Sequence, residues 1–277
     1  MAVFDAAARA FIETKPLEHT LLISVPAGLR ERGPHAYGSG DPRFGWYETA
    51  DGSVAGAFVQ TPPHPLLMTG LPAQAAESLP DALLGAGRTL SGLNGPAGVA
   101  KTVAATWCAR TGDSQTVYET HRLYVLDDLI EPVPALPGSA RIAVERDRGL
   151  LTTWYGAFAE ELGEHVLNVQ RVIEDRLEFG GLILWEVDDV PVSMAGVTRL
   201  LDGDSTRIGP VYTPKELRGR GYAAAATASV TRTAIERGAR VVSLFTNLDN
   251  PTSNALYQRL GYRAIEDRTV IHFTAAG

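Results

Sequence analysis

Two arginines and two glycines alternate in the segment LRGRGYAAAAT, which runs from Leu217 to Thr227. A glycine-rich turn lets backbone amides approach an anion closely, and the first N–H groups of a helix have no partner inside the helix. The helix dipole is positive at the same end, and Arg218 and Arg220 add further positive charge. The segment therefore predicts a cradle for a phosphate or pyrophosphate, whereas in isolation it could also be an exposed Arg-Gly loop that ends a strand.

Two common phosphate-binding motifs do not fit this segment. It lacks the Gly-Lys-Ser/Thr of a Walker A loop, and it is no Gly-x-Gly-x-x-Gly following the first strand of a doubly wound unit. Its flanks favour a site between a strand and a helix, because TRIGPVY before it has a strand pattern and the alanine-rich run after it has a helical pattern.

The motif and its surroundings resemble the GCN5-related N-acetyltransferase (GNAT) superfamily. Arg218-x-x-Gly221-x-Ala223 is similar to the Arg/Gln-x-x-Gly-x-Gly/Ala signature of that family. Downstream, NLDNPTSNALYQRLGYR resembles the second GNAT signature, at Asn250, Asn254, Tyr257, Gly261 and Tyr262. The two signatures have the order and separation that the family's helix-strand-helix geometry requires, and the resemblance covers roughly residues 138–273.

This resemblance implies an α/β (α+β) fold with a mixed sheet, the GNAT fold, in the C-terminal half. Two parallel strands, ending near Tyr212 and Thr246, would splay apart to admit the pantetheine arm of acetyl-CoA, and Pro210 fits a bulge in the first of them. Asn250 and Asn254 would position the cofactor or cap a helix. The implied cofactor contacts are the backbone of Val211, Tyr212 and Thr213 for pantetheine, and the amides of Arg218, Gly219, Arg220, Gly221, Tyr222 and Ala223 for pyrophosphate.

The resemblance also implies the acid of the reaction. Amine attack on the thioester produces a tetrahedral intermediate whose collapse expels a thiolate, and Tyr257 would donate the proton as general acid. A core tyrosine on a short helix is the structural alternative. For the base, Glu186 ends a strand that could face the acceptor, and ordered water could replace it. The following Asp188 and Asp189 are interpreted as a solvated hairpin turn.

We therefore expect an acyl-CoA-dependent N-acyltransferase that moves acetyl from acetyl-CoA to a primary amine by direct attack. The alternatives are transfer of a larger acyl group on the same fold and a non-catalytic acyl-CoA sensor. The acidic composition favours a cationic small molecule as acceptor, while protein N-termini and lysines stay open. The aromatic residues Trp154, Tyr155 and Phe158 would wall the acceptor site or face the core.

The chain is expected to have two parts. A linker over residues 132–138, with three prolines and a glycine, would separate an N-terminal domain (1–131) from the catalytic domain (139–277). Both halves suggest the order hairpin, strand, helix, strand, helix, strand, which indicates a weak internal repeat. The first half lacks the arginine-glycine signature and a matching tyrosine, so it is predicted to be a degenerate GNAT-like unit without cofactor, as in the bacterial two-part GNAT proteins that the chain resembles.

The predicted elements of the second half are a strand (140–144), two helices (145–163 and 164–180), strands at 182–187 and 191–200, a turn (201–205), a strand (206–212), a helix (221–238), a strand (240–246), a helix (250–261) and final strands (262–273). In the first half we expect helices at 4–14, 75–87 and 95–112, a hairpin at 44–61, and strands at 19–29, 64–72 and 115–126.

Composition excludes several classes of protein. The chain has 277 residues, 45% hydrophobic and 21% charged, which is ordinary for a globular protein, and its formal net charge of -7 argues against a nucleic-acid binder. The single cysteine, Cys108, cannot form an internal disulfide and is interpreted as structural. The six histidines contain no His-x-x-x-His pair, so no metal is expected. With no signal peptide or membrane span in the sequence, a cytoplasmic monomer or homodimer is predicted.

Overall fold

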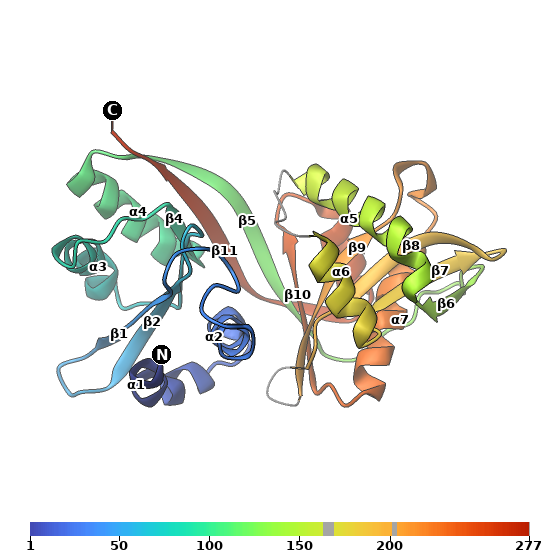
Figure 1. Cartoon of the computed structure of the whole chain (residues 1–277), viewed down its shortest axis with the longest axis horizontal. Helices are drawn as coiled ribbons and strands as arrows, with labels where there is room; N and C mark the ends of the chain where they lie inside the picture. The colour runs from blue at the N-terminus through green and yellow to red at the C-terminus, as the bar shows by residue number, and fades with distance from the viewer. Residues whose placement is uncertain (163–168, 201–203, 277) are drawn as a thin grey trace. The chain divides into compact units, whose positions relative to one another are not determined.

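The computed structural model describes residues 1–162, 169–200 and 204–276 of the chain, which divides into two compact units (Figure 1). Unit 1 comprises residues 1–123, 247–249 and 265–277, and unit 2 comprises residues 124–246 and 250–264. Strands β5 (Ser114–Leu126) and β11 (Tyr262–Thr274) each contribute to both units, so the division does not follow a single cut in the sequence. Residues 132–138 lie within unit 2.

Unit 1 is a mixed sheet with helices against it. Its strands are hydrogen-bonded in the order β1-β2-β3-β4-β11-β5, and β3 and β4 form a parallel pair while β1, β2 and β3 are joined antiparallel. The remaining elements are α1 (Ala2–Glu13), α2 (Thr20–Arg32), β1 (Arg43–Glu48), β2 (Val54–Gln60), β3 (Leu66–Met68), α3 (Ala73–Gly85), β4 (Gly92–Pro96) and α4 (Ala97–Thr111).

The strand predicted at residues 19–29 is wrong, because this segment forms helix α2. Its β-branched residues Ile23 and Val25 and the internal Pro26 favour a strand or a break when the sequence is read locally. In the fold, Leu22 and Leu29 are buried and the helix packs against β2 and β3. Short apolar runs do not distinguish a strand from a buried helix, so here the tertiary packing outweighs the local preference.

Unit 2 has the sheet order β11-β5-β10-β9-β8-β7-β6. Strands β6 to β9 are joined antiparallel, and β9 and β10 form a parallel pair. The elements are β6 (Ser139–Ile142), η1 (Glu145–Asp147), α5 (Arg148–Leu162), α6 (Val169–Glu178), β7 (Leu182–Val187), β8 (Val190–Val197), β9 (Ser205–Tyr212), η2 (Lys215–Leu217), α7 (Tyr222–Glu236), β10 (Val241–Asn247) and α8 (Pro251–Arg259).

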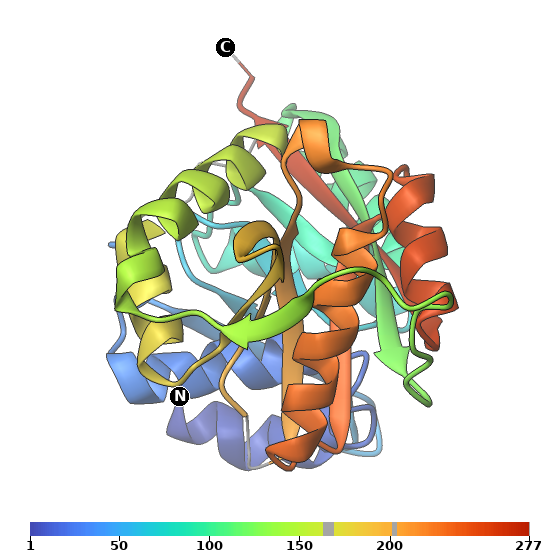
Figure 2. The same ribbon diagram turned by 90° about the vertical axis from the view of Figure 1, so that its right-hand side faces the viewer.

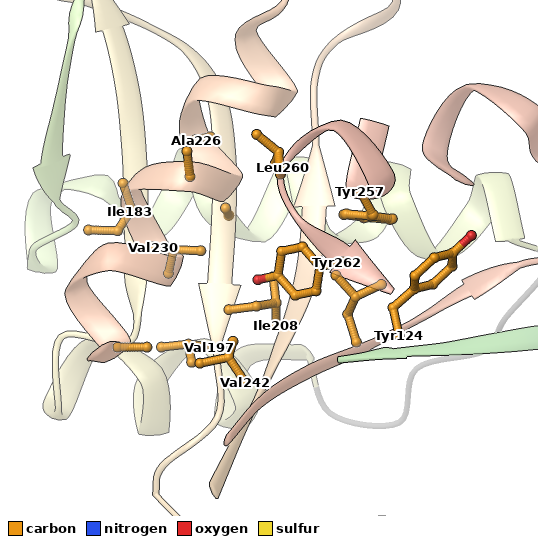
Figure 3. Close-up of a cluster of buried hydrophobic side chains, with 14 of the residues drawn as sticks. Tyr124, Ile183, Val197, Ile208, Ala226, Val230, Val242, Tyr257, Leu260 and Tyr262 are labelled. Carbon is orange, nitrogen blue, oxygen red and sulfur yellow. The ribbon is translucent and has the colours of Figure 1, made fainter. Parts of the chain in front are cut away.

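Helices cover both faces of the sheet in unit 2 (Figure 2). Side chains of a strand alternate between faces, so Leu182 and Leu184 of β7 pack with α5 and α6, whereas Ile183 packs against α7. Ala226 and Val230 of α7 belong to this second core, which Figure 3 shows. The small residues of α7 let the helix lie close to the strands. Burial of β7 on both faces explains why its first four residues, 182–185, are all apolar.

The elements of the two halves occur in the same order along the chain. The segment from α1 to β5 contains two helices, a hairpin, a strand, a helix, a strand, a helix and a final strand. The segment from α5 to β11 contains the same series. This order is what the predicted internal repeat requires. Of the second-half predictions, residues 164–168 of the helix at 164–180 and residues 201–203 of the turn lie outside the described residues.

Candidate functional site

Strands β9 and β10 are paired only over their first residues. The parallel pairing joins Ser205 to Val241 and ends where Ile208 meets Leu244. Beyond that point β9 continues to Tyr212, with Val211 and Tyr212 paired to β8 on the opposite side. The edge of β9 that faces β10 is therefore available there to hydrogen-bond an extended ligand, as an added strand would.

A bulge in β9 marks the place where the strands separate. Val197 of β8 pairs with Ile208, but Ala195 pairs with Val211, so Gly209 and Pro210 together stand opposite the single residue Gly196. The bulge expected at Pro210 is thus confirmed. A proline fits there because it has no N–H to contribute to the ladder.

Arg176, which the sequence patterns did not indicate, fixes this bulge from helix α6. Its guanidinium Nη1 donates to the carbonyl of Gly209. A side chain at position 196 would collide with the same guanidinium, which explains why β8 carries a glycine there. Burial lowers the pKa of Arg176. The sequence could not indicate this contact, because residues 176, 196 and 209 come together only when α6 packs on the sheet.

The loop after β9 ends in two glycines whose backbone is left-handed. Gly219 has a φ of 75° and Gly221 a φ of 83°, a region that other residues rarely adopt. Gly221 is the N-cap of α7 and provides no side-chain cap, so the first N–H groups of the helix have no such partner. A Cβ at Gly219 would meet no atom within 4 Å, so the turn is bare on that side.

Residues 132–138 pass over the start of α7, and in Figure 2 the green segment before β6 crosses this orange helix. The Leu136 methyls lie 2.9 and 3.0 Å from the position that a Cβ on Gly221 would take. The segment is held further along by Trp185, whose indole N–H donates to the Pro137 carbonyl at 3.0 Å. Gly221 is therefore required both by its backbone conformation and by the side chain packed on it.

Arg218 ties the loop to helix α5. Its Nε donates to the Thr213 carbonyl at 2.9 Å, and its Nη2 donates to both carboxylate oxygens of Glu161 at 2.8 and 2.7 Å. The nitrogen of Lys215 lies 3.8 Å from the same carboxylate. Arg218 thus stabilises the loop geometry, while Arg220 is exposed and donates at 3.5 Å to the carbonyl of Glu216.

Tyr257 of α8 is buried beside two other tyrosines (Figure 3), with 8% of its surface exposed. Its ring centroid lies 6.3 Å from that of Tyr124 and 6.0 Å from that of Tyr262. The hydroxyl of Tyr262 is 2.6 Å from Thr231 Oγ1, whereas the hydroxyl of Tyr257 has no hydrogen-bond partner among the residues that the structure describes. Burial raises the pKa of Tyr257 to about 12, so the phenol keeps its proton at neutral pH.

The two asparagines at the start of α8 have defined structural contacts. Asn250 is the N-cap, and its Oδ1 accepts from the backbone N–H of Ser253 at 3.0 Å. Asn254 donates to the Asn250 carbonyl at 2.7 Å and accepts from the Tyr124 hydroxyl at 2.9 Å. The capping role that the sequence left open for Asn250 is present. Tyr124, at the end of β5, carries no motif that could have indicated its place in this network.

Comparison with known proteins agrees with this geometry. Residues 149–262 match the profile of the Acetyltransferase (GNAT) family. These residues form a GNAT domain. No curated protein matches the sequence significantly.

Solved structures extend the likeness to nearly the whole chain. A GCN5-related N-acetyltransferase from Sphaerobacter thermophilus is similar with a TM-score of 0.62 and 19% identity, over 99% of this chain and 91% of the other. One from Kribbella flavida has a TM-score of 0.58 and 18% identity, over 94% and 96%. A Drosophila protein reaches a TM-score of 0.67 at 11% identity, over 98% and 96%. At such identities the comparison shows the fold alone.

An arginine side chain lies beside the parallel strand pair of unit 1. Its parallel strands pair at Leu66–Leu93 and Leu67–Asn94. Directly beyond, the buried Arg268 of β11 donates through Nη2 to the Met68 carbonyl at 2.9 Å and the Asn94 carbonyl at 3.2 Å. These two carbonyls are thus engaged by a side chain, and the absence of a cofactor site in the first half stays a prediction.

Glu186 of the GNAT domain is engaged in an ion pair. Its Oε1 accepts from Arg141 Nε at 2.8 Å, and Arg141 also forms two hydrogen bonds with Asp147 at 2.6 and 2.8 Å. The hydrogen bond to Asp147 contributes most to raising the pKa of Arg141, and the bond to Glu186 adds to it. In turn, Arg141 lowers the pKa of Asp147. Glu186 lies on β7, two strands from β9, or about 10 Å across the sheet.

Other predicted residues of the GNAT domain have simpler surroundings. Asp188 and Asp189 have φ values of 50° and 62° in the β7–β8 connection, which confirms the hairpin turn. Trp154 is buried with its ring centroid 6.1 Å from that of Tyr212, so it belongs to the core. Tyr155 and Phe158 are half-buried and stack edge to face.

The described residues contain neither a cluster suited to a metal ion nor a helix suited to a membrane. No group of three His, Cys, Asp or Glu side chains among residues 1–162, 169–200 and 204–276 is placed to hold a metal ion. Over the same ranges no helix has both the length and the apolar character that crossing a membrane requires. Burial raises the pKa of the Cys108 thiol, which fits the structural role expected for it.

Proposed function

We propose that unit 2 is an acyl-CoA-dependent N-acyltransferase that transfers acetyl from acetyl-CoA to a primary amine. One observation carries the proposal: the separation of β9 from β10 leads directly into the bare glycine turn at the start of α7, and the protonated hydroxyl of Tyr257 belongs to the adjoining helix α8. The strand edge would bind the extended arm of the donor, the glycine turn would bind its pyrophosphate, and Tyr257 would supply the proton.

The backbone can hold the two ends of the donor separately. The edge of β9 at Val211 and Tyr212, with Thr213 following, would pair with the amides of the pantetheine arm. The N–H groups from Arg218 to Ala223 would hold the pyrophosphate, since the glycines leave them accessible and the helix dipole favours an anion. The fit is supported by Gly219, where no atom lies near the position of a Cβ.

The donor supplies a thioester, which the neutral amine attacks directly to give a tetrahedral intermediate that releases thiolate. Tyr257 would donate a proton to that sulfur, and its raised pKa keeps the proton available. Glu186 stays our proposal for the base. Because two strand spacings separate Glu186 from β9, it would accept the proton through a water molecule. It would do so while its carboxylate is paired with Arg141.

The test is a screen of small primary amines with acetyl-CoA, in which released CoA is measured as free thiol. We expect turnover with at least one amine and no release without amine. A parallel binding measurement with CoA separates the outcomes. CoA binding without turnover on any amine would favour the non-catalytic sensor, and turnover only with longer acyl donors would favour the larger acyl group.

A further inference from the structure

A hollow in unit 1 is lined by none of the residues assigned to acyl transfer. It has a volume of about 280 Å³ and lies between helix α3 and the outer strands β1 and β2. Phe58 and Gly56 of β2 contribute to one wall, and Leu79 and Ala82 of α3 contribute to the other. This volume is near the lower end for ligand pockets in proteins and admits a ligand of roughly ten non-hydrogen atoms.

Two arginines give the apolar hollow a charged end. Arg43 of β1 and Arg88, which follows α3, both line it and also line an adjoining hollow. Neither forms an ion pair with a carboxylate in the part of the chain that the structure describes. Asp41 lines the adjoining hollow as well, so the two guanidiniums exceed the acidic charge at this end.

A buried polar side chain lies at the same end. Gln60 is 4% exposed, lines the hollow and receives a long hydrogen bond of 3.5 Å from Arg43 Nη1. Guanidinium groups form planar forks that suit a carboxylate, and an amide can add a donor to the same ligand. Tyr47 and Leu71 continue the lining with largely apolar surface.

From this combination we infer that unit 1 binds a small amphipathic monocarboxylate, with its apolar body between α3 and β2 and its carboxylate at Arg43 and Arg88. The apolar walls select for a hydrocarbon or aryl body, and the two arginines select for the anion over a neutral analogue of equal size. The site is independent of the proposed acyl transfer, so either inference can fail without the other.

The experiment is isothermal titration of the full chain with octanoate and with octanamide, which has the same body and no charge. We expect octanoate to bind at least tenfold more tightly than octanamide. Arg88→Gln and Arg43→Gln should each weaken octanoate at least fivefold and leave octanamide unchanged. Lys101→Gln, an exposed charge loss on α4 outside the hollow, is the matched control and should change neither.

A filling variant tests the location. Ala82 is exposed on α3 and lines the hollow, so Ala82→Trp can occupy it from the rim without displacing a buried side chain. It should abolish binding of both ligands while the thermal midpoint stays near that of the parent. Equal affinity for octanoate and octanamide, equal losses in Lys101→Gln and Arg88→Gln, or no saturable octanoate binding would each overturn the inference.

Discussion

The glycine turn before α7 can be tested by placing one methyl group at each of its two glycines. Gly219→Ala and Gly221→Ala both force alanine into a left-handed backbone, at φ values of 75° and 83°. The surroundings differ, because position 219 is open whereas a methyl at 221 would lie 2.9 and 3.0 Å from the Leu136 methyls. The two variants therefore share one cost, and only Gly221→Ala has the second.

The magnitudes follow from these contacts. The left-handed conformation costs about 1–2 kcal/mol for a residue with a Cβ, which we expect in full for Gly219→Ala. Inserting a methyl into packed surroundings costs about 1–3 kcal/mol, and the lower end applies at 221 because the Leu136 side chain is half-buried and can move. Gly221→Ala should therefore lower the free energy of unfolding by about 2–3 kcal/mol.

The assay is urea unfolding of the ligand-free chain in a double-mutant cycle with Leu136→Ala. Removing the Leu136 methyls should recover about 1 kcal/mol in the Gly221→Ala background, which exceeds the usual additivity error of about 0.3–0.5 kcal/mol. The same cycle with Gly219→Ala is the control and should show no coupling. If Leu136→Ala adds to both glycine variants alike, Leu136 does not pack on Gly221 and the reasoning about this turn fails.

Three further predictions concern the proton donor and two arginines. Tyr257→Phe should lower kcat about 100-fold with little change in the KM for acetyl-CoA, and an unchanged kcat would remove Tyr257 from the chemistry. Because the active form is the protonated phenol with a pKa of about 12, the activity of the parent should not fall through ionisation of Tyr257 below about pH 11. Glu161→Gln breaks a half-exposed pair with Arg218, so urea unfolding should change by less than about 1 kcal/mol, and a much larger loss would contradict this. Arg268→Ala should cost about 3–5 kcal/mol at pH 7, because it leaves the Glu266 carboxylate without its cation. Burial raises the pKa of Glu266, and removal of the Arg268 cation raises it further, so the carboxyl of the variant takes up a proton more readily as the pH falls. The loss measured by urea should therefore shrink from pH 7 to pH 5, and a pH-independent loss would refute the coupling.

Local patterns were sufficient for most elements of the second half. Strands with apolar runs, such as residues 182–187, and helices that begin after Asn250 or Gly221 follow from residue spacing and caps. In the first half, the segment at 19–29 was predicted to hold a strand and is a helix instead. Its helical state depends on burial against β2 and β3, which neighbouring residues in the sequence do not encode.

By itself the sequence determined which kind of backbone the loop before α7 must have, because Gly219 and Gly221 permit left-handed turns that leave amide groups uncovered. It also determined the bulge at Pro210, since proline lacks a ladder donor. The tertiary structure decided what surrounds these points. Glu161 meets Arg218 and Arg268 reaches Met68 across long stretches of chain, and such pairings arise only when the strands and helices pack, so no spacing within one motif could indicate them.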